Sequence, residues 1–399
     1  MSGNSIADVA VIGLGAIGSA VLFQLASRGV RAVGVDRYHS PHTLGSSHGE
    51  TRITRLAVGE GEAYAPLVQR SHVLWREIER LSGADLLRQT GGLIIGSREG
   101  RVRHHGQGDF ISRTVGVAKK YDVPHEVLDS AGIVERFPQL RLRGDEVGYY
   151  EPSAGMLAPE RCVATQLRLA AARGAEIRTG EQALAIEQAD GAVEIITDQG
   201  RISAQRAVVT AGPWLRGLVG GQFARLARPY RQVLHWFEVD AAHDYSPGHF
   251  PVFIWMHGDG DEDYFYGFPQ VAGSPGLKVA SERYAADTDP DAMAREVAAP
   301  ESREMFDRHV SGRLRGVGPR ATQATTCLYT VTPDSGFIVD DLPGKDRVLV
   351  VSACSGHGFK HSAALGEAVA ERVTAGISRI DLSAFGLARF ANSSLGTVA

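Results

Sequence analysis

The 399-residue sequence predicts an α/β fold that combines a domain built on a parallel sheet with a second, α+β domain whose sheet is mixed and largely antiparallel. Three observations predict it. An apolar strand, a glycine turn, a helix and a second strand open the chain. Aromatic and β-branched runs follow between 229 and 284, and strand, glycine turn and helix return between 348 and 376. The first domain is therefore expected to be assembled from discontinuous segments.

The first strand and its turn carry a dinucleotide-binding pattern. Residues 6–12 are apolar and rich in β-branched side chains, as is typical of a strand buried on both faces of a parallel sheet. Gly13, Gly15 and Gly18 follow in the spacing G-x-G-x-x-G. The first permits a tight turn, the second lets the backbone approach a pyrophosphate, and the third lets the helix lie close to the strand. We expect backbone N–H groups here to point at phosphates.

The next elements complete a Rossmann-like unit. A helix is predicted from Ala16 to Arg28, and a strand over 31–35 is followed by Asp36, a residue placed to accept hydrogen bonds from ribose hydroxyls. Strand, glycine triplet, helix, strand and acid occur in the required order, so the segment predicts dinucleotide binding. The predicted cofactor site here comprises Gly13, Gly15, Ala16, Ile17, Gly18, Asp36 and Arg37.

A glycine- and serine-rich connection over 40–64 follows the second strand. It carries five polar residues that we single out: His48, Thr51, Arg52, Arg55 and Glu60. Long loops that leave the carboxyl ends of sheet strands line the ligand crevice, so we expect this one to run along the cofactor. A solvated loop with surface ion pairs is the alternative. An amphipathic helix is predicted over 64–80.

Further along, helices and strands alternate. We predict a strand over 90–97, polar helices within 98–149, a helix from 159 to 174, a strand over 176–179, a hairpin over 192–203 and a buried strand over 208–212 that leads to a turn beside the cofactor. Antiparallel strands are predicted over 229–237, 251–256, 264–269 and 276–284, a charged helical segment over 290–314, and sheet over 321–340. The predicted division is 1–88, 148–225 and 321–399 for the first domain, and 89–147 and 226–320 for the second.

Composition narrows the function. The net charge of −4 and the lack of basic runs disfavour nucleic acid and anionic membrane surfaces as partners, and no apolar run approaches the roughly 18 residues that a membrane span needs. The first strand starts near residue 6, which leaves no room for a targeting peptide, so we expect a cytoplasmic protein. Cys162, Cys327 and Cys354 form neither a paired framework nor a C-x-x-C motif. We expect no disulfide and no metal site.

Lysine is scarce in this chain. Only five lysines occur, so 37 of the 42 basic residues are arginine. A lysine kept in an apolar or glycine-rich setting is therefore a candidate for chemistry that needs a compact ammonium rather than a guanidinium fork. Lys278 and Lys360 stand in such settings.

Nearly the whole chain resembles the monomeric sarcosine oxidase and N-methyltryptophan oxidase family of amine-oxidising flavoproteins, within the D-amino-acid-oxidase-like group. Eight segments in the same order carry the resemblance: GLGAIGSA at 13–20, PHTLGSSHGETRITR at 41–55, EPSAGML at 151–157, PYRQV at 229–233, YGFP at 266–269, GLK at 276–278, CLYTVTPDSGFIVD at 327–340 and SGHGFK at 355–360. The resemblance implies an FAD-binding domain made of discontinuous segments and a catalytic domain whose sheet covers the flavin.

The resemblance also implies how FAD is held. The family attaches FAD covalently through a cysteine that matches Cys327. Cys354, next to the SGHG segment, is the alternative attachment residue. Backbone N–H groups of Gly356, His357 and Gly358 would stabilise the negative charge of the reduced ring. The remaining predicted cofactor-binding residues are Ser46, Thr51, Arg52, Gln182, Gly212, Trp214, Phe359 and Lys360.

The catalytic residues follow from the same matches. Arg52 and Lys360 would bind the substrate carboxylate, with Arg52 alternatively bracing the flavin. Lys278 would activate O2 on the other face of the ring, because a fixed cation favours the step in which O2 gains negative charge. Tyr266 and Tyr329 would line the substrate pocket and could hydrogen-bond the substrate; the alternative is that they are aromatic residues of the core. His48 is also included in the predicted catalytic set.

Two residues depart from the family pattern. Glu282 stands where sarcosine oxidases carry a histidine four residues after the lysine, and Val58 stands where they carry a tyrosine. An acid would favour a substrate with an additional donor or a more tightly held cationic amine, whereas Val58 would leave more room. A bulkier N-methylated or cyclic amino acid is then expected rather than sarcosine. Alternatively, Glu282 pairs with Arg283 or another arginine at the surface.

The expected reaction is oxidation of the C–N bond of a secondary amino acid to an imine by a monomeric flavoprotein, with O2 reduced to H2O2. The flavin carries the chemistry, so the protein orients the amine and tunes the ring. A dehydrogenase that passes electrons to another acceptor and a flavin-binding protein without catalysis are the alternatives.

Overall fold

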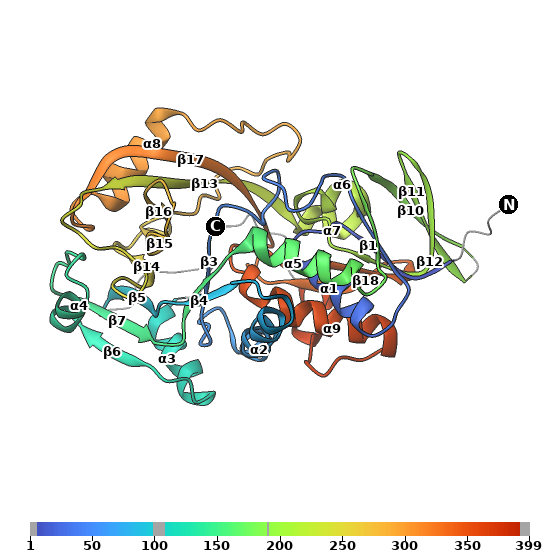
Figure 1. The fold of residues 1–399 in the computed structure, drawn as a ribbon, viewed down its shortest axis with the longest axis horizontal. Coiled ribbons are helices and arrows are strands. Elements are labelled where there is room, and N and C mark those ends of the chain that lie inside the picture. The colour runs from blue at the N-terminus through green and yellow to red at the C-terminus, as the bar shows by residue number, and fades with distance from the viewer. Residues whose placement is uncertain (1–5, 99–107, 190, 392–399) are drawn as a thin grey trace.

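Residues 6–98, 108–189 and 191–391 are described by a computed structural model, and they form two lobes that are each built on an eight-stranded sheet (Figure 1). The first sheet contains the strand that opens the chain, and the second contains the long strands near residues 228 and 331. The α/β fold class predicted from the sequence is confirmed.

The first sheet has a parallel centre. β1 (Ala7–Ile12) pairs in parallel with β2 (Ala32–Asp36) and with β12 (Gly200–Val209). β9 (Glu176–Thr179) extends the sheet beyond β2, and β19 (Lys345–Ser352) pairs in parallel with the end of β12. The antiparallel strands of this sheet are β10 (Ala183–Ala189), β11 (Ala192–Thr197) and β18 (Ile338–Leu342).

The helices of this lobe pack against one another beside the sheet (Figure 1). α1 (Ala16–Ser27) lies between α5 (Pro159–Ala171) and α9 (Ser362–Ala375), and α2 (Ala65–Ser82) contacts α9. A Cβ atom on Gly366 would lie 2.5 Å from the Cβ of Ala20, so small residues set the close approach of α9 to α1. Helix α9, near the end of the described residues, is thereby held against α1.

The second sheet is mixed and largely antiparallel, as predicted. Its strand order is β17 (Val317–Val331), β13 (Arg228–Val239), β16 (Leu277–Ala280), β15 (Tyr264–Gly267), β14 (Val252–Met256), β5 (Gly92–Ser97), β7 (Glu146–Glu151) and β6 (Glu126–Asp129). Only the β14–β5 pair among them is parallel.

Two parts of this sheet were not expected from the sequence. Residues 321–331 were assigned to the first domain, but they belong to β17, which pairs with β13 from Val331 opposite Arg228 to Val317 opposite Val239. The stretch 98–149, of which 99–107 lie outside the described residues, contains β6 and β7 besides α3 (Phe110–Lys120) and α4 (Ser130–Arg136). Periodicity identifies a strand but not the sheet in which it finds its partner.

A small sheet and short helices complete the architecture. β3 (Arg52–Thr54), β8 (Gly155–Leu157) and β4 (Leu87–Gln89) form a three-stranded antiparallel sheet. The remaining helices and turns are η1 (Glu62–Tyr64), η2 (Gly212–Trp214), α6 (Leu215–Val219), α7 (Gly221–Leu226), α8 (Ala299–Met305), η3 (Phe306–Val310), η4 (Phe359–His361), η5 (Ser383–Phe385) and η6 (Leu387–Phe390).

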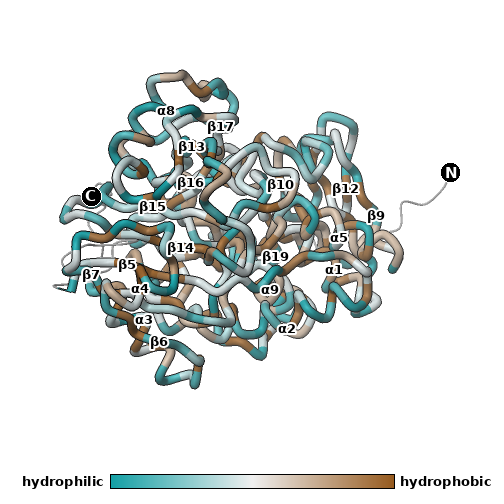
Figure 2. The backbone as a smooth tube through the Cα atoms, turned by 60° about the vertical axis from the view of Figure 1, so that its left-hand side comes forward, coloured by the Kyte–Doolittle hydropathy of each residue, from teal (hydrophilic) through white to brown (hydrophobic). Residues whose placement is uncertain are grey.

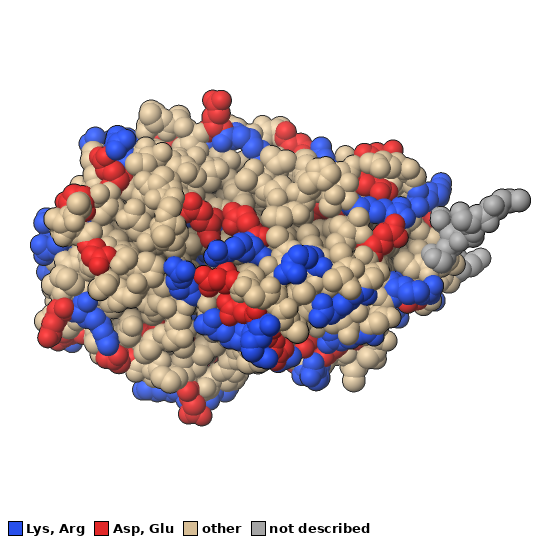
Figure 3. Space-filling view, in the orientation of Figure 1, with Lys and Arg blue, Asp and Glu red and all other residues tan. Residues whose placement is uncertain are grey.

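Apolar segments follow the strands and helices inside both lobes, whereas polar segments lie in the outer loops (Figure 2). The central strands β1, β12 and β19 are buried through β-branched side chains such as Val11, Val208 and Val350. On the face seen in Figure 3, basic and acidic side chains are interspersed. Within the described ranges, no helix is both long enough and apolar enough to span a bilayer.

Candidate active site

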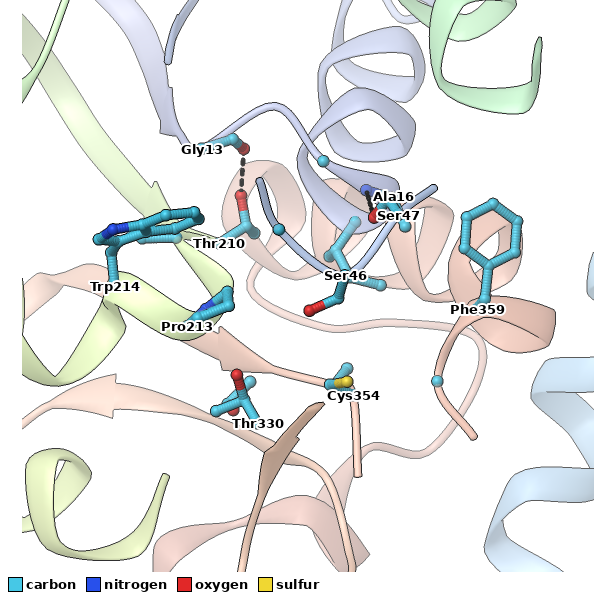
Figure 4. Close-up of a pocket in the computed structure, with 18 of the residues that line it drawn as sticks. Gly13, Ala16, Ser46, Ser47, Thr210, Pro213, Trp214, Thr330, Cys354 and Phe359 are labelled. Atoms are coloured by element: carbon cyan, nitrogen blue, oxygen red, sulfur yellow. Dashed lines mark hydrogen bonds between the residues drawn. The ribbon is translucent and has the colours of Figure 1, made fainter. Parts of the chain in front are cut away.

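A cavity of about 410 Å³ lies where the carboxyl ends of β1, β2, β12 and β19 meet the second sheet. The predicted residues that line it near the first glycine turn are Gly13, Gly15, Ala16, Ile17, Asp36, Arg37, Ser46, Gln182, Gly212 and Trp214. Those that line it toward the second sheet are Arg52, Tyr266, Glu282, Tyr329, Gly356, His357, Gly358, Phe359 and Lys360. Segments up to some 350 residues apart thus converge on one cavity, and Figure 4 shows Gly13, Trp214, Cys354 and Phe359 around it.

The glycine turn after β1 has the geometry that a bound pyrophosphate requires. Gly13 has a φ of +90°, and a Cβ atom there would lie 2.7 Å from the carbonyl oxygen of Thr210. A Cβ on Gly18 would lie 1.8 Å from the carbonyl oxygen of Gly13, so this glycine sets the contact between α1 and the turn and does not line the cavity. At Gly15 the nearest atom to such a Cβ is Ser47 Oγ at 3.4 Å, so this backbone stays accessible from the cavity.

Asp36 ends β2 at the same edge. Its Oδ2 accepts the backbone N–H of Leu14 at 2.6 Å, and its Oδ1 accepts that of Tyr38 at 2.8 Å. The acid therefore ties the glycine turn to the end of β2 while it lines the cavity. Beside it, Arg37 and the indole N–H of Trp214 both bind Asp291, each at 2.8 Å. These contacts close the outer wall of the cavity.

The turn after β19 brings Gly356, His357 and Gly358 to the cavity. The backbone N–H groups of His357 and Gly358 both donate to the carbonyl oxygen of Cys354, at 2.9 and 2.8 Å. These two amides donate within the tight turn, and their role in stabilising a reduced ring stays a prediction. Phe359 begins the 3-10 turn that leads into α9 and also lines the cavity.

Arg55 was singled out in the sequence but given no role, and it belongs to a cluster of charged side chains that lines the cavity. Its Nη2 binds both carboxylate oxygens of Glu60, at 2.9 and 2.8 Å, and Lys360 Nζ binds the same carboxylate at 2.9 Å. All three side chains are buried and line the cavity. Two cations share one carboxylate, so the cluster carries an excess positive charge. Among the described residues, Arg55 Nε has no hydrogen-bond partner.

Arg52 lines the cavity beside this cluster. Its guanidinium donates to the carbonyl oxygens of Thr51 and Ser46, both at 2.9 Å, and its Nη2 lies 3.6 Å from Cys327 Sγ. Cys327 itself is buried and does not line the cavity, whereas Cys354 does (Figure 4). Burial raises the pKa of the Cys327 thiol, while the nearby charges of Arg52 and Lys278 oppose that shift.

Three more predicted residues, Lys278, Thr51 and His48, lie behind the cavity wall. Lys278 Nζ donates to the carbonyl oxygen of Gly49, and to the carbonyl oxygen and Oγ1 of Thr51 at 2.9 and 3.1 Å, and it sits 4.5 Å from the Phe268 ring centre. Burial, followed by the charge of Arg52, lowers the pKa of Lys278 well below its usual value. His48 is buried beside both cations, and burial is the main reason that its pKa falls to about 3.

The second sheet supplies the aromatic wall. The hydroxyls of Tyr266 and Tyr329 are 2.8 Å apart, and both side chains line the cavity. Glu282 follows β16 and also lines the cavity, with 4% of its surface exposed. The alternative that Glu282 lies at the surface was wrong, because the side chain is buried, and Arg283 pairs with Glu304 at 3.0 Å. Sequence reasoning gave no role to Tyr264 and Tyr284, whose hydroxyls both donate to Glu282 Oε2.

Val58 does not enlarge the cavity, contrary to expectation. It is fully buried in the core around α2 and α9 and does not line the cavity. The smaller side chain is therefore accommodated by core packing.

Residues 8–372 match the profile of the family described as FAD dependent oxidoreductase. The chain belongs to this family. Monomeric sarcosine oxidase of Bacillus sp. (strain NS-129) is 34% identical over 384 residues, which is 96% of each chain. N-methyl-L-tryptophan oxidase of Yersinia pestis (strain Pestoides F) is 35% identical over 388 residues, 96% of this chain and 99% of that protein.

Among solved structures, NikD, described as an unusual amino acid oxidase essential for nikkomycin biosynthesis, matches with a TM-score of 0.81 and 24% identity over 95% of this chain and 97% of that one. That likeness concerns the fold. In this FAD-dependent oxidoreductase, the glycine turn after β1 and the start of α1 fit the pyrophosphate of an FAD molecule.

Proposed function

We propose that this chain oxidises the C–N bond of a secondary, N-methylated or cyclic, amino acid to an imine, and that O2 serves as electron acceptor and gives H2O2. The Arg55–Glu60–Lys360 cluster is the observation that carries the proposal, because its excess positive charge offers a site for a substrate carboxylate inside the cofactor cavity. The names of the sarcosine and N-methyl-L-tryptophan oxidases support the same substrate class and a monomer.

In this reaction FAD, when bound, would accept a hydride equivalent from the carbon beside the amine nitrogen and pass two electrons to O2. The chain's own residues would orient the substrate. Arg55 and Lys360 hold the carboxylate, and Tyr266 and Tyr329 face it from the second sheet. Lys278 would supply a buried positive charge close to the cavity, because three oxygen atoms accept hydrogen bonds from its Nζ and favour the ammonium form. We assign no general base to the hydride step.

An anaerobic screen tests the proposal. N-methyl amino acids, pipecolate and proline are mixed with the FAD-loaded enzyme, and loss of flavin absorbance near 450 nm reports reduction. Air is then admitted, and peroxide is measured. At least one compound is expected to reduce the flavin and to yield one peroxide per turnover. If no secondary amino acid reduces the flavin, the proposal is wrong. Reduction without peroxide would point to a dehydrogenase.

We further propose that FAD is attached covalently through Cys327. Acid-denatured wild-type protein is then expected to retain its yellow colour, whereas Cys327→Ser protein is expected to lose it. Arg52, at 3.6 Å from the sulfur, would favour the thiolate that attacks. The new C–S bond replaces one S–H bond and one cofactor C–H bond, and the two electrons go to O2.

Cys354→Ser is the matched control, because Cys354 lines the cavity directly. It is expected to keep the colour in acid. Colour retained by Cys327→Ser but lost by Cys354→Ser would assign the attachment to Cys354.

The pH dependence of carboxylate binding gives a separate check. Burial is the main cause that lowers the pKa of Lys360, to about 8, so the ammonium is charged below this pH and neutral above it. The dissociation constant of 2-(methylthio)hexanoate, a carboxylate without a titrating amine, is expected to rise as the pH passes 8. Binding is measured by perturbation of the flavin spectrum. Lys360→Met should bind weakly at every pH, and a pH-independent wild-type constant would contradict the role.

A further inference from the structure

Glu282 is an acidic side chain built into the wall of the cavity. It is 4% exposed and follows the buried strand β16, which also carries Lys278. Two phenols hold it: Tyr264 from β15 and Tyr284 both donate to Oε2. A carboxylate is costly to bury, so a cavity that keeps one requires compensation by donors of this kind.

The two phenols can act only as donors to this carboxylate. Burial is the main cause, and Glu282 the next, that raises the pKa of Tyr264 and of Tyr284 well above 10. Both hydroxyls therefore keep their protons, and each fixes the orientation of the carboxylate. Tyr264 and Tyr284 are positioning residues in this arrangement, because they act on a ligand through Glu282.

The charges of the cavity wall are complementary to a zwitterion. Arg55 and Lys360 provide the positive end, with Glu60 between them. Glu282 lines the same cavity as Arg55 and Lys360, so groups of both signs of charge face one compartment. An amino acid carries a carboxylate and an ammonium only a few ångströms apart, and a site with both signs of charge selects such a molecule over a simple acid.

We propose that Glu282 binds a cationic N–H donor of the substrate, so that the enzyme takes a zwitterionic amino acid with its carboxylate at Arg55 and Lys360. This inference rests on the proposed function, which it deepens. The donor is either the ammonium of a basic side chain or the reacting secondary ammonium, which releases one proton to solvent before the hydride leaves the neighbouring carbon. Both offer the same chemistry, namely a charge-assisted hydrogen bond to the Glu282 carboxylate.

Three ligands of similar shape distinguish the reacting ammonium from a side-chain ammonium as the group that Glu282 binds. Nα-methyl-L-lysine has both ammonium groups, Nα-methyl-L-norleucine has the reacting one, and 2-(methylthio)hexanoate has neither. Affinities are measured anaerobically from the flavin spectrum of the FAD-loaded enzyme, with rapid mixing where reduction follows. Glu282→Gln is compared with Glu304→Gln, a control on the exposed partner of Arg283.

We expect Glu282→Gln to weaken the binding of a cationic ligand roughly 10- to 100-fold. The affinity for 2-(methylthio)hexanoate should stay within about twofold of the wild-type value. If both amino acids bind more weakly to Glu282→Gln, the reacting ammonium is the group that Glu282 binds. If only the lysine derivative binds more weakly, Glu282 binds the side-chain ammonium. Tyr284→Phe should reduce the preference for cationic ligands over the thioether by a smaller factor. This variant provides a test even if Glu282→Gln fails to retain FAD. Glu304→Gln should bind all three ligands like the wild type.

Equal weakening of all three ligands, or no change in any, would overturn the inference. The proposed function fails separately, if neither amino acid reduces the wild-type flavin. Reduction that proceeds with Glu282→Gln at unchanged affinity and unchanged discrimination rejects only the role of Glu282.

Discussion

Arg55→Met and Lys360→Met are each expected to lower kcat/KM for a secondary amino acid by roughly 100-fold. Each variant removes one of the two cations that flank Glu60, and the cluster then loses its excess positive charge. The remaining cation is neutralised by Glu60 and offers little to a substrate carboxylate. The effect should appear mainly in the dissociation constant obtained from anaerobic flavin reduction at several substrate concentrations.

Arg283→Met is the matched control for this pair, because Arg283 is partly exposed and pairs with Glu304. It should leave kcat/KM within about twofold, as surface ion pairs contribute little. The opposing result would be an Arg55→Met enzyme that keeps its FAD and its affinity for N-methyl amino acids. In that case Arg52, the arginine named from the sequence, would be the better candidate for the carboxylate.

Lys278→Met is expected to slow reoxidation of the reduced flavin by O2 by roughly 100-fold or more, and to change flavin reduction by substrate much less. O2 gains negative charge as it accepts the first electron, and a fixed cation in a dry site stabilises that charge. Lys278 also holds the loop that carries Arg52, through the carbonyl oxygens of Gly49 and Thr51. Stopped-flow absorbance separates the two half-reactions.

Lys278→Gln distinguishes charge from loop anchoring. Its amide keeps N–H donors for the loop carbonyls but has no positive charge, so it should show the slow reoxidation of Lys278→Met. Lys120→Met, on an exposed lysine paired with Glu62, is the control and should behave like the wild type. Normal reoxidation in Lys278→Gln would show that Lys278 acts by holding the loop and has no part in the oxygen step.

Much of the fold could be predicted because local patterns encode it. The run 6–12, the glycines after it and the residues of α1 have the periodicity and turn chemistry of a βαβ unit, and the structure places β1, α1 and β2 accordingly. β17 shows the limit of this approach. Its alternation predicts a strand, but its pairing with β13 joins residues about 80 to 100 apart, and no local pattern specifies that partner.

The site was predictable to a similar degree. Motif matches brought Arg52, Lys360, Tyr266, Tyr329 and Glu282 to one cavity, where the structure has them. Arg55 was passed over because a charged residue in a polar loop looks the same whether it faces solvent or a buried partner. The one available signal was its spacing from Glu60, which a surface ion pair would share.

By itself, the sequence determined that this protein binds a dinucleotide in an α/β fold and that it resembles amine-oxidising flavoproteins, since those properties depend on short segments whose backbone chemistry is local. Only the tertiary structure decided that Glu60 joins Arg55 to Lys360 across 300 residues, and that Glu282 points into the cavity under two tyrosines. A charge acquires its role from burial and from its neighbours. Both are set when distant segments pack together.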